Sequence, residues 1–310
     1  MSKRLPDEPS LLATIAAGIA RWAPAEGETA TAIPGLSLLR IHSRLIVGRG
    51  LLRPSVCIVA QGEKVAQAGN DTTLRYRAGQ FLATSIEMPL AGRAVNATSA
   101  KPYLAAALTL TSHDVFAVMK EAKVSLATTS AKGRTTFVGE CDARLLDVLA
   151  RMVNALDDER DARFLAPMLR RELIYRLVMG PSADAIRQSA LLARADDGLG
   201  RAVDWIRDHY KDRLDIGELA RFANMSTSSL HHKFKTAVSM GPLQYQKALR
   251  LEEARRLMLV GSADATRAAF EVGYESSSQF TREYHRRFGL PPGQDLKRIR
   301  EGASADASLV

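Results

Sequence analysis

The sequence is poor in the residues that cross-link small domains or build metal sites. Its 310 residues include only two cysteines, Cys57 and Cys141, and six histidines. Two isolated cysteines provide neither a disulfide framework nor the paired spacing of a structural zinc site. We therefore expect a protein of a reducing compartment that holds no metal and no cofactor.

Long apolar runs and enzyme signatures are missing as well. The longest apolar stretches, such as Leu104 to Leu110, fall short of the roughly 18 residues that span a bilayer, so we expect no membrane partner and a cytoplasmic location. The first nine residues lack the apolar segment of a signal peptide. We found no Gly-x-Ser-x-Gly elbow, phosphate loop, Gly-x-Gly-x-x-Gly fingerprint or His-Glu-x-x-His pair, so we predict no catalytic residues. An enzyme is nevertheless the rival class.

The composition present is that of a folded chain with two domains. Hydrophobic residues make up 46% and charged residues 25% of the sequence, and the length is about twice that of a usual domain. The net charge is +9. Residues 201–300 carry 18 Lys and Arg against 12 Asp and Glu, whereas residues 1–200 carry 25 against 20. This bias suits a polyanionic partner, although a solvated basic face is the commoner cause.

Short apolar runs separated by turn residues indicate strands between about residues 36 and 111. Many short strands at close spacing predict a small barrel or sandwich. The period changes after Cys141, where two amphipathic helices are predicted between about residues 142 and 179. Each predicted helix has an apolar stripe, and the stripe of the second is a core face or alternatively a dimer seam. The first stripe contains Leu145, Leu149, Met152, Val153 and Leu156, and the second contains Phe164, Met168, Leu169, Leu173 and Leu177. The best strand candidates are Ser55 to Ala60, Thr73 to Tyr76, Gln80 to Ser85 and Tyr103 to Thr111.

The most specific signal is a helix-turn-helix pattern that begins at Asp215. Asp215 to Glu218 forms a capping box, a short helix ends near Phe222, and Ser226 caps a second helix with Leu230 and Phe234 turned inward. The 3.6-residue period then places short polar and cationic groups outward, and such groups suit base edges and phosphates. These groups are Thr227, Ser228, His231, His232 and Lys235.

The same device recurs about fifty residues later. Asp264 to Val272 predicts a helix, Gly273 supplies a left-handed turn residue, and Ser276 caps a helix whose inward stripe is Phe280, Tyr284 and Phe288. A long helix opened by Pro242 joins the two units. The outward residues of the second unit are Ser277, Ser278, Thr281, Arg282 and His285.

The segment from Leu199 to Lys297 resembles the DNA-binding domain of the AraC/XylS family of transcription regulators. The motifs that carry the resemblance include Met225-Ser226, Phe234-Lys235, Gly241-Pro242, Arg250-Leu251, Val272-Gly273-Tyr274, Ser278-Gln279-Phe280 and Pro291-Pro292. Ala265, Ala268 and Gln294-Asp295 depart from the family pattern, which predicts looser packing of the second unit.

The N-terminal region resembles the cupin-type domain of one AraC subgroup. The resemblance rests on Arg53-Pro54-Ser55-Val56-Cys57, Gln61-Gly62-Glu63-Lys64, Tyr76, Gly79-Gln80 and Lys101-Pro102-Tyr103-Leu104. It implies a small barrel that senses a ligand or aids dimerisation. A metal is not expected, because His42 and His113 lie far apart without the His-x-His and Glu cluster of metal cupins.

We therefore expect an α+β protein: an N-terminal cupin-like β-barrel with flanking helices, and a C-terminal all-α domain of two helix-turn-helix units joined by a long helix. The regulatory and dimerisation domain is expected over residues 1–182, a linker over 183–198 with residues 185–195 alternatively helical, the DNA-binding domain over 199–300, and a flexible tail over 301–310.

Several residues have a plainer interpretation beside the functional one. His231 and His232 are recognition-helix residues or only solvent-facing ones, and Arg282 pairs with a guanine edge or clamps a phosphate. Cys57 is a candidate sensor of an oxidant or aldehyde, but a buried thiol in an apolar strand is the commoner case.

The function expected is that of a sequence-specific, nucleoid-associated transcription regulator. Its expected partners are double-stranded DNA and a second copy of the chain, with RNA polymerase and a small-molecule effector as further candidates. An architectural DNA binder without regulatory input is the other alternative, and ligand-dependent DNA affinity would separate the two.

Overall fold

The structure is a computed structural model that describes residues 6–42, 50–69, 72–124, 133–194 and 197–307. Two antiparallel sheets form the centre of the N-terminal half, in the strand orders β1-β2-β9-β4-β7-β10 and β3-β8-β5-β6. The strands are β1 (Gly27–Ala30), β2 (Leu36–Ile41), β3 (Gly50–Leu52), β4 (Ser55–Gln61), β5 (Glu63–Ala68), β6 (Thr72–Arg77), β7 (Gln80–Thr84), β8 (Met88–Ala94), β9 (Tyr103–Thr109) and β10 (Thr136–Glu140).

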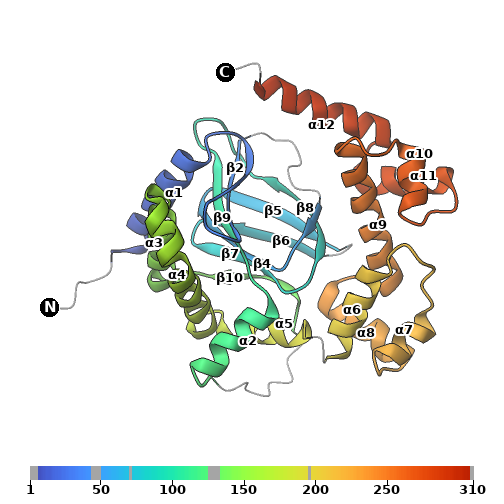
Figure 1. The fold of residues 1–310 in the computed structure, drawn as a ribbon, viewed down its shortest axis with the longest axis horizontal. Coiled ribbons are helices and arrows are strands. Elements are labelled where there is room, and N and C mark those ends of the chain that lie inside the picture. Colours follow the sequence, from blue (N-terminus) through green and yellow to red (C-terminus); the bar gives the residue numbers. More distant parts are fainter. Residues whose placement is uncertain (1–5, 43–49, 70–71, 125–132, 195–196, 308–310) are drawn as a thin grey trace.

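Helices cover one side of the six-stranded sheet, and the helical C-terminal domain lies on the other side of the sheets (Figure 1). The covering helices bury an apolar layer against the sheet that includes Ile15, Ile58, Leu149 and Leu173. They are α1 (Glu8–Trp22), α2 (Ser112–Glu121), α3 (Ala143–Asn154), a short 3₁₀ turn η1 (Ala155–Asp157), α4 (Glu159–Met179) and α5 (Ala183–Leu192). The expected mixed fold is confirmed; β1, β10, α1 and α2 lie outside the ranges in which we expected strands and helices.

The apolar stripe predicted for α3 is confirmed, but the stripe predicted for α4 is partly wrong. Leu169, Leu173 and Leu177 are buried, whereas the side chains of Phe164 and Met168 are 73% and 51% exposed. The inner face of α4 also includes Ala162 and Ala166, so the 3.6-residue period turns positions 164 and 168 outward.

The C-terminal domain is all helical. Helix α5 occupies most of the range 183–198 that we expected to be a linker, and its Ile186 and Ala190 pack in the N-terminal core. The expected tail is helical through Ala307, in a helix that Pro292 opens. The helices are α6 (Gly198–Asp208), α7 (Ile216–Phe222), α8 (Thr227–Val238), α9 (Pro242–Leu259), α10 (Ala265–Glu271), α11 (Ser277–Phe288) and α12 (Pro292–Ala307).

Candidate nucleic-acid interface

The first helix-turn-helix unit consists of α7 and α8. The Asp215 carboxylate accepts a hydrogen bond from the Glu218 N–H at 2.9 Å, and the Ser226 hydroxyl accepts one from the Ser229 N–H at 3.1 Å. These caps fix where each helix begins. Asn224 turns the chain between the helices with a φ of 53° in the left-handed region, a conformation that asparagine tolerates better than most residues.

The five residues predicted on the outer face of α8 are all exposed. Leu230 and Phe234 are completely buried, as the predicted period requires. The Lys235 ammonium makes no hydrogen bond or ion pair with any described residue, whereas Lys233 lies 3.4 Å from Asp197. The exposed set is Thr227, Ser228, His231, His232 and Lys235.

The second unit consists of α10 and α11 and repeats this arrangement. Gly273 turns the chain with a φ of 89°, and Ser276 caps α11. Phe280, Tyr284 and Phe288 are buried. Ser278, Thr281, Arg282 and His285 are exposed, and Ser277 is half-buried. Within the described part of the chain the Arg282 guanidinium has no partner, while Arg287 is paired with Glu252 at 3.0 Å.

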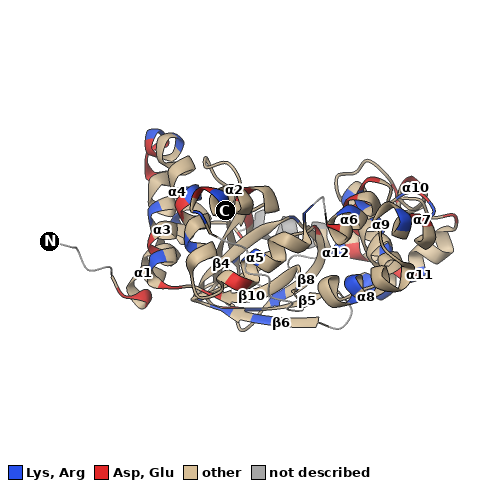
Figure 2. Cartoon of the chain, turned by 90° about the horizontal axis from the view of Figure 1, so that it is seen from below, with Lys and Arg blue, Asp and Glu red and all other residues tan. Residues whose placement is uncertain are grey.

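Helices α8 and α11 lie at opposite ends of α9 and along the same side of the helical domain (Figures 1 and 2). Helix α9 has 18 residues, which at about 1.5 Å per residue gives a length of about 27 Å. Successive major grooves on one face of DNA repeat every ~34 Å. The connecting helix is thus of the same order of length as the spacing between successive major grooves.

Arg250 of α9 joins the two units through backbone carbonyls. Its guanidinium donates to the carbonyl oxygens of Tyr210 at 2.6 Å, Asp212 at 2.8 Å and Lys211 at 3.0 Å, next to the first unit. It also donates to the carbonyl of Gly273, in the turn of the second unit, at 2.7 Å. Sequence reasoning noted Arg250 only as part of a motif, because carbonyls that are distant in sequence leave no pattern.

The second unit contains a buried ionic network. The Arg255 guanidinium lies 2.8 Å from the carboxylate of Asp295, which is completely buried. The Tyr284 hydroxyl donates to the same carboxylate at 3.0 Å, and Arg298 pairs with it at 2.9 Å. Burial raises the pKa of Tyr284 well above its ordinary value. Asp295, one of the departures from the family pattern, thus connects α9, α11 and α12, which is a contact that the expectation of looser packing did not include.

The first unit is attached to the N-terminal domain at the C-terminal end of α8. The Ala237 carbonyl accepts hydrogen bonds from the N–H and the hydroxyl of Thr135, at 3.0 and 2.8 Å. The Ser239 hydroxyl lies 2.9 Å from that of Thr72, and the Tyr245 hydroxyl donates to the Glu87 carbonyl at 2.6 Å. A recognition helix of the DNA-binding domain is thus bonded directly to the sheet domain.

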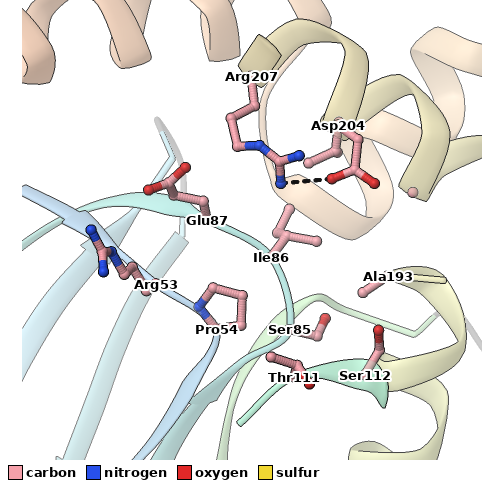
Figure 3. A pocket seen from close by; sticks show the side chains of 12 residues that line it. Arg53, Pro54, Ser85, Ile86, Glu87, Thr111, Ser112, Ala193, Asp204 and Arg207 are labelled. Carbon is pink, nitrogen blue, oxygen red and sulfur yellow. Dashed lines mark ion pairs between the residues drawn. The ribbon is translucent and has the colours of Figure 1, made fainter. Parts of the chain in front are cut away.

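A pocket of about 380 Å³ opens at this junction (Figure 3). Residues of both domains line it: Arg53, Ser85 and Glu87 from the sheet domain, and Asp204 and Arg207 from α6. Arg207 pairs with Asp204 at 2.7 Å across the helical side of the pocket.

Cys57 does not have the environment of a reactive thiol. It is 6% exposed, and burial raises its pKa above the ordinary value. A reactive cysteine needs access and a lowered pKa. The described residues contain no cluster of three or more metal-binding side chains, and within the same ranges no helix is both long and apolar enough to cross a bilayer.

Two family profiles match the chain. One, described as the AraC-type transcriptional regulator N-terminus, matches residues 32–185. The other, described as a helix-turn-helix domain, matches residues 219–298.

Curated relatives match over about half of the chain. The HTH-type transcriptional activator RhaS of Escherichia fergusonii is 28% identical over 172 residues, which cover 54% of this chain and 58% of that protein. RhaS of Shigella boydii is 24% identical over 161 residues, which cover 51% of this chain and 56% of that protein. The chain thus spans little more than half the length of these relatives.

Solved structures share the fold over most of the chain at low sequence identity. ToxT from Vibrio cholerae O395 superposes with a TM-score of 0.56 at 10% identity, over 84% of this chain and 96% of that one. Wild-type ToxT from Vibrio cholerae strain SCE256 bound to an unsaturated fatty acid gives a TM-score of 0.54 at 11% identity, over 84% and 93%. At these identities the comparison concerns the fold.

Proposed function

The chain belongs to the AraC/XylS family of transcription regulators, and from that premise we propose that it binds specific duplex DNA sites through both helix-turn-helix units. Its proposed role is to regulate transcription without catalysing a reaction. The observation that carries this proposal is the pair of exposed faces on α8 and α11, whose Lys235 and Arg282 make no ion pair within the described residues. The less exposed cations Lys233 and Arg287 are paired instead, with Asp197 and Glu252. Unpaired cations on a recognition face are free to bind phosphates and base edges.

The roles of the ten exposed and half-buried residues follow from their chemistry. Arg282 has the fork that pairs with a guanine edge, and we assign it to base reading. Lys235 is a flexible point charge, and we assign it to the DNA backbone. The remaining residues, Thr227, Ser228, His231, His232, Ser277, Ser278, Thr281 and His285, complete the two contact faces.

The N-terminal domain, residues 1–182, is proposed to dimerise the protein and to sense a small molecule. Four large apolar side chains form one exposed stripe along α4: Phe164, Met168, Tyr175 and Met179 are 73%, 51%, 37% and 50% exposed. A stripe of this kind is unusual on a monomer, and a second copy of the same helix would cover it. A fatty acid is bound by ToxT, which shares the fold, and this supports a small-molecule effector. Sedimentation of the purified chain tests the dimer.

The remaining partners follow from the proposed role. A regulator that acts on transcription works in the cytoplasm at the nucleoid, and RNA polymerase is its proposed protein partner. The curated relatives are named activators, whereas the geometry here does not favour activation over repression.

The decisive experiment maps the genomic DNA bound by the full chain and measures binding to an enriched fragment as salt is varied. We expect enriched sites with two half-sites and an affinity that falls steeply as salt rises, because bound Lys and Arg displace condensed counterions. A folded chain that binds neither enriched nor random duplex DNA at about 50 mM salt would contradict the proposal.

A further inference from the structure

Polar side chains from both sheets meet in the interior of the N-terminal domain. Lys64 of β5 and Tyr76 of β6 are cross-strand partners and face inward from the four-stranded sheet. Cys57 of β4 and Tyr103 of β9 face them from the six-stranded sheet. Lys64 is 7% exposed, and the other three are 6% exposed or less. We call these four residues the interior polar group.

Two members of the interior polar group are buried without partners. The Lys64 ammonium makes no hydrogen bond or ion pair with any described residue and lies 5.8 Å from the centre of the Tyr103 ring. The Tyr103 hydroxyl, on a residue with no exposed surface, makes no hydrogen bond of normal geometry with a described residue, although the Cys57 thiol and the Tyr76 hydroxyl lie beside it. Buried polar groups are nearly always hydrogen-bonded, and a buried charge without a counter-ion is particularly unfavourable. The two groups therefore point to a ligand that supplies acceptors.

The positions around the interior polar group carry small side chains. A Cβ atom added to Gly92 would lie 2.8 Å from Cε of Lys64, so the glycine makes room for the lysine stem. Facing sheets pack about 10 Å apart and are normally separated by interdigitated large side chains. Alanines fill little of such a layer. The buried residues of this cluster in the sheet domain include five alanines beside larger side chains such as Val59, Leu82 and Met88. The alanines are Ala66, Ala68, Ala94, Ala97 and Ala105.

We infer that the interior of the N-terminal domain binds a small organic acid, whose carboxylate accepts hydrogen bonds from the Lys64 ammonium and the Tyr103 hydroxyl. The inference rests on the proposed function, because it names the class of effector that the regulator senses. An anion is favoured over a neutral molecule because the Lys64 amine has no carboxylate partner, and a bound anion would stabilise its charged form. Glu28 is the carboxylate whose charge affects the pKa of Lys64. It accepts a hydrogen bond from the Ser37 hydroxyl at 2.5 Å and makes no ion pair with the lysine.

Proton exchange follows from the burial of Lys64. Burial lowers the pKa of Lys64, while Cys57 and Glu28 oppose that shift, and the two tyrosine hydroxyls are the other titratable groups facing it. A bound carboxylate favours the charged amine, so its binding takes up protons wherever free Lys64 is partly neutral. In the free protein the folded state holds fewer protons than the unfolded state between the lowered pKa and the ordinary lysine value of about 10.4. Stability contributed by this group therefore rises with pH through that window.

Calorimetry on the full chain tests the inference with hexanoate and benzoate as probes and hexanamide and benzamide as neutral controls. We expect at least one acid to bind, with its amide weaker by about tenfold or more, because the amide cannot supply the charge. Repeating the titration in buffers of different ionisation enthalpy is expected to show proton uptake. Binding of neither acid at millimolar concentration, or equal binding of acid and amide, overturns the inference.

Three variants locate the site. Lys64→Met keeps the apolar stem and is expected to weaken acid binding about tenfold or more while raising the melting temperature of the free protein. Tyr103→Phe tests the second donor by itself if Lys64→Met does not fold. Lys120→Met, at an exposed lysine of α2, is the matched control and should bind as the wild type does. Unchanged acid binding in Lys64→Met or in Tyr103→Phe contradicts the assigned contacts.

DNA binding is measured separately on the same preparations without acid. A wild-type chain that binds acid but no DNA refutes the proposed function and leaves the site in place. A chain that binds DNA but neither acid refutes only the site.

Discussion

The two helix-turn-helix units have the same layout, but their cores are connected differently. In the first unit, Leu230 and Phe234 belong to an apolar cluster that continues through Tyr245 to residues of the sheets such as Met88. In the second unit, Phe280 and Tyr284 belong to a cluster made of helical-domain residues alone. The first unit therefore shares its core with the N-terminal domain, and the second does not.

Polar contacts follow the same division. The second unit holds its own shape through the buried Arg255–Asp295 pair, whose fixed geometry contributes more to a unique arrangement than to net stability. The first unit instead gives its Ala237 carbonyl to Thr135 of the N-terminal domain. A change within the sheets has a direct route to α8, so we expect an effector to act mainly on the first unit.

The largest effects are expected from removing one buried ring in each unit. Phe234→Ala and Phe280→Ala should each cost roughly 3–5 kcal/mol, because each leaves a cavity in a fully packed core. Hydrogen exchange should then differ: Phe234→Ala is expected to deprotect β8 together with α8, and Phe280→Ala only the second unit. Equal deprotection of β8 in both variants would mean that the cores are not separate.

The next effect concerns the ionic network of the second unit. Asp295→Asn removes the charge that pairs with Arg255 and is expected to cost about 3 kcal/mol, since it leaves a buried guanidinium without a counter-ion. Exchange should rise in α11 and α12 while α8 stays protected. Asp208→Asn, at an exposed residue of α6, is the control and should change stability by less than about 0.5 kcal/mol. A similar loss of stability in both variants would show that the buried network does not stabilise the second unit.

DNA readout gives a third contrast between the units. Arg282→Ala in the second unit should cost about 1–3 kcal/mol on the specific site and relax the preference at one base pair. Lys235→Ala in the first unit should weaken binding to specific and random DNA alike. It should also reduce the slope of log affinity against log salt concentration by about one. Binding-site selection on both variants distinguishes these results. An unchanged consensus with Arg282→Ala would reassign that residue to phosphate contact.

The smallest effect is expected at the contact between α8 and the sheet domain. Thr135→Val keeps the shape and the backbone N–H but removes the hydroxyl that donates to Ala237, at a cost of about 1 kcal/mol. Amide hydrogen exchange at the C-terminal end of α8 should increase, and exchange at α11 should not change. Thr73→Val, at an exposed position of β6, is the matched control. If α8 and α11 respond equally to Thr135→Val, the first unit is not the coupled one.

The features of this structure that could be predicted from the sequence are those that depend on residues close together in the chain. Helix caps such as Ser226 and Ser276 depend on residues three positions away, and buried stripes such as Leu230 and Phe234 follow a fixed period. These patterns were sufficient to place both helix-turn-helix units and to identify their outward faces.

The contacts that sequence reasoning missed join residues far apart in the chain. Thr135 meets Ala237 across 102 positions, and Arg255 meets Asp295 across 40. A hydrophobic period also says which residues share a face without saying how wide the covered face is. For that reason Phe164 and Met168 were placed in one stripe with Leu169 and Leu173, as a core face or alternatively a dimer seam. Helix α4 buries only the face that includes Leu169 and Leu173.

The four hydrogen bonds from Arg250 to backbone carbonyls fix the orientation of α8 relative to α11. That orientation limits which spacings between the two halves of a DNA site the protein can bind. Because one planar group ties the end of α6 to the turn before α11, the two recognition helices cannot easily rotate about the axis of α9. Each base pair inserted between the two half-sites turns one of them by roughly 36° relative to the other, since B-DNA has about ten base pairs per turn. A site lengthened by one or two base pairs would thus present its second half to the wrong side of a protein that cannot follow it, unless the DNA itself untwists.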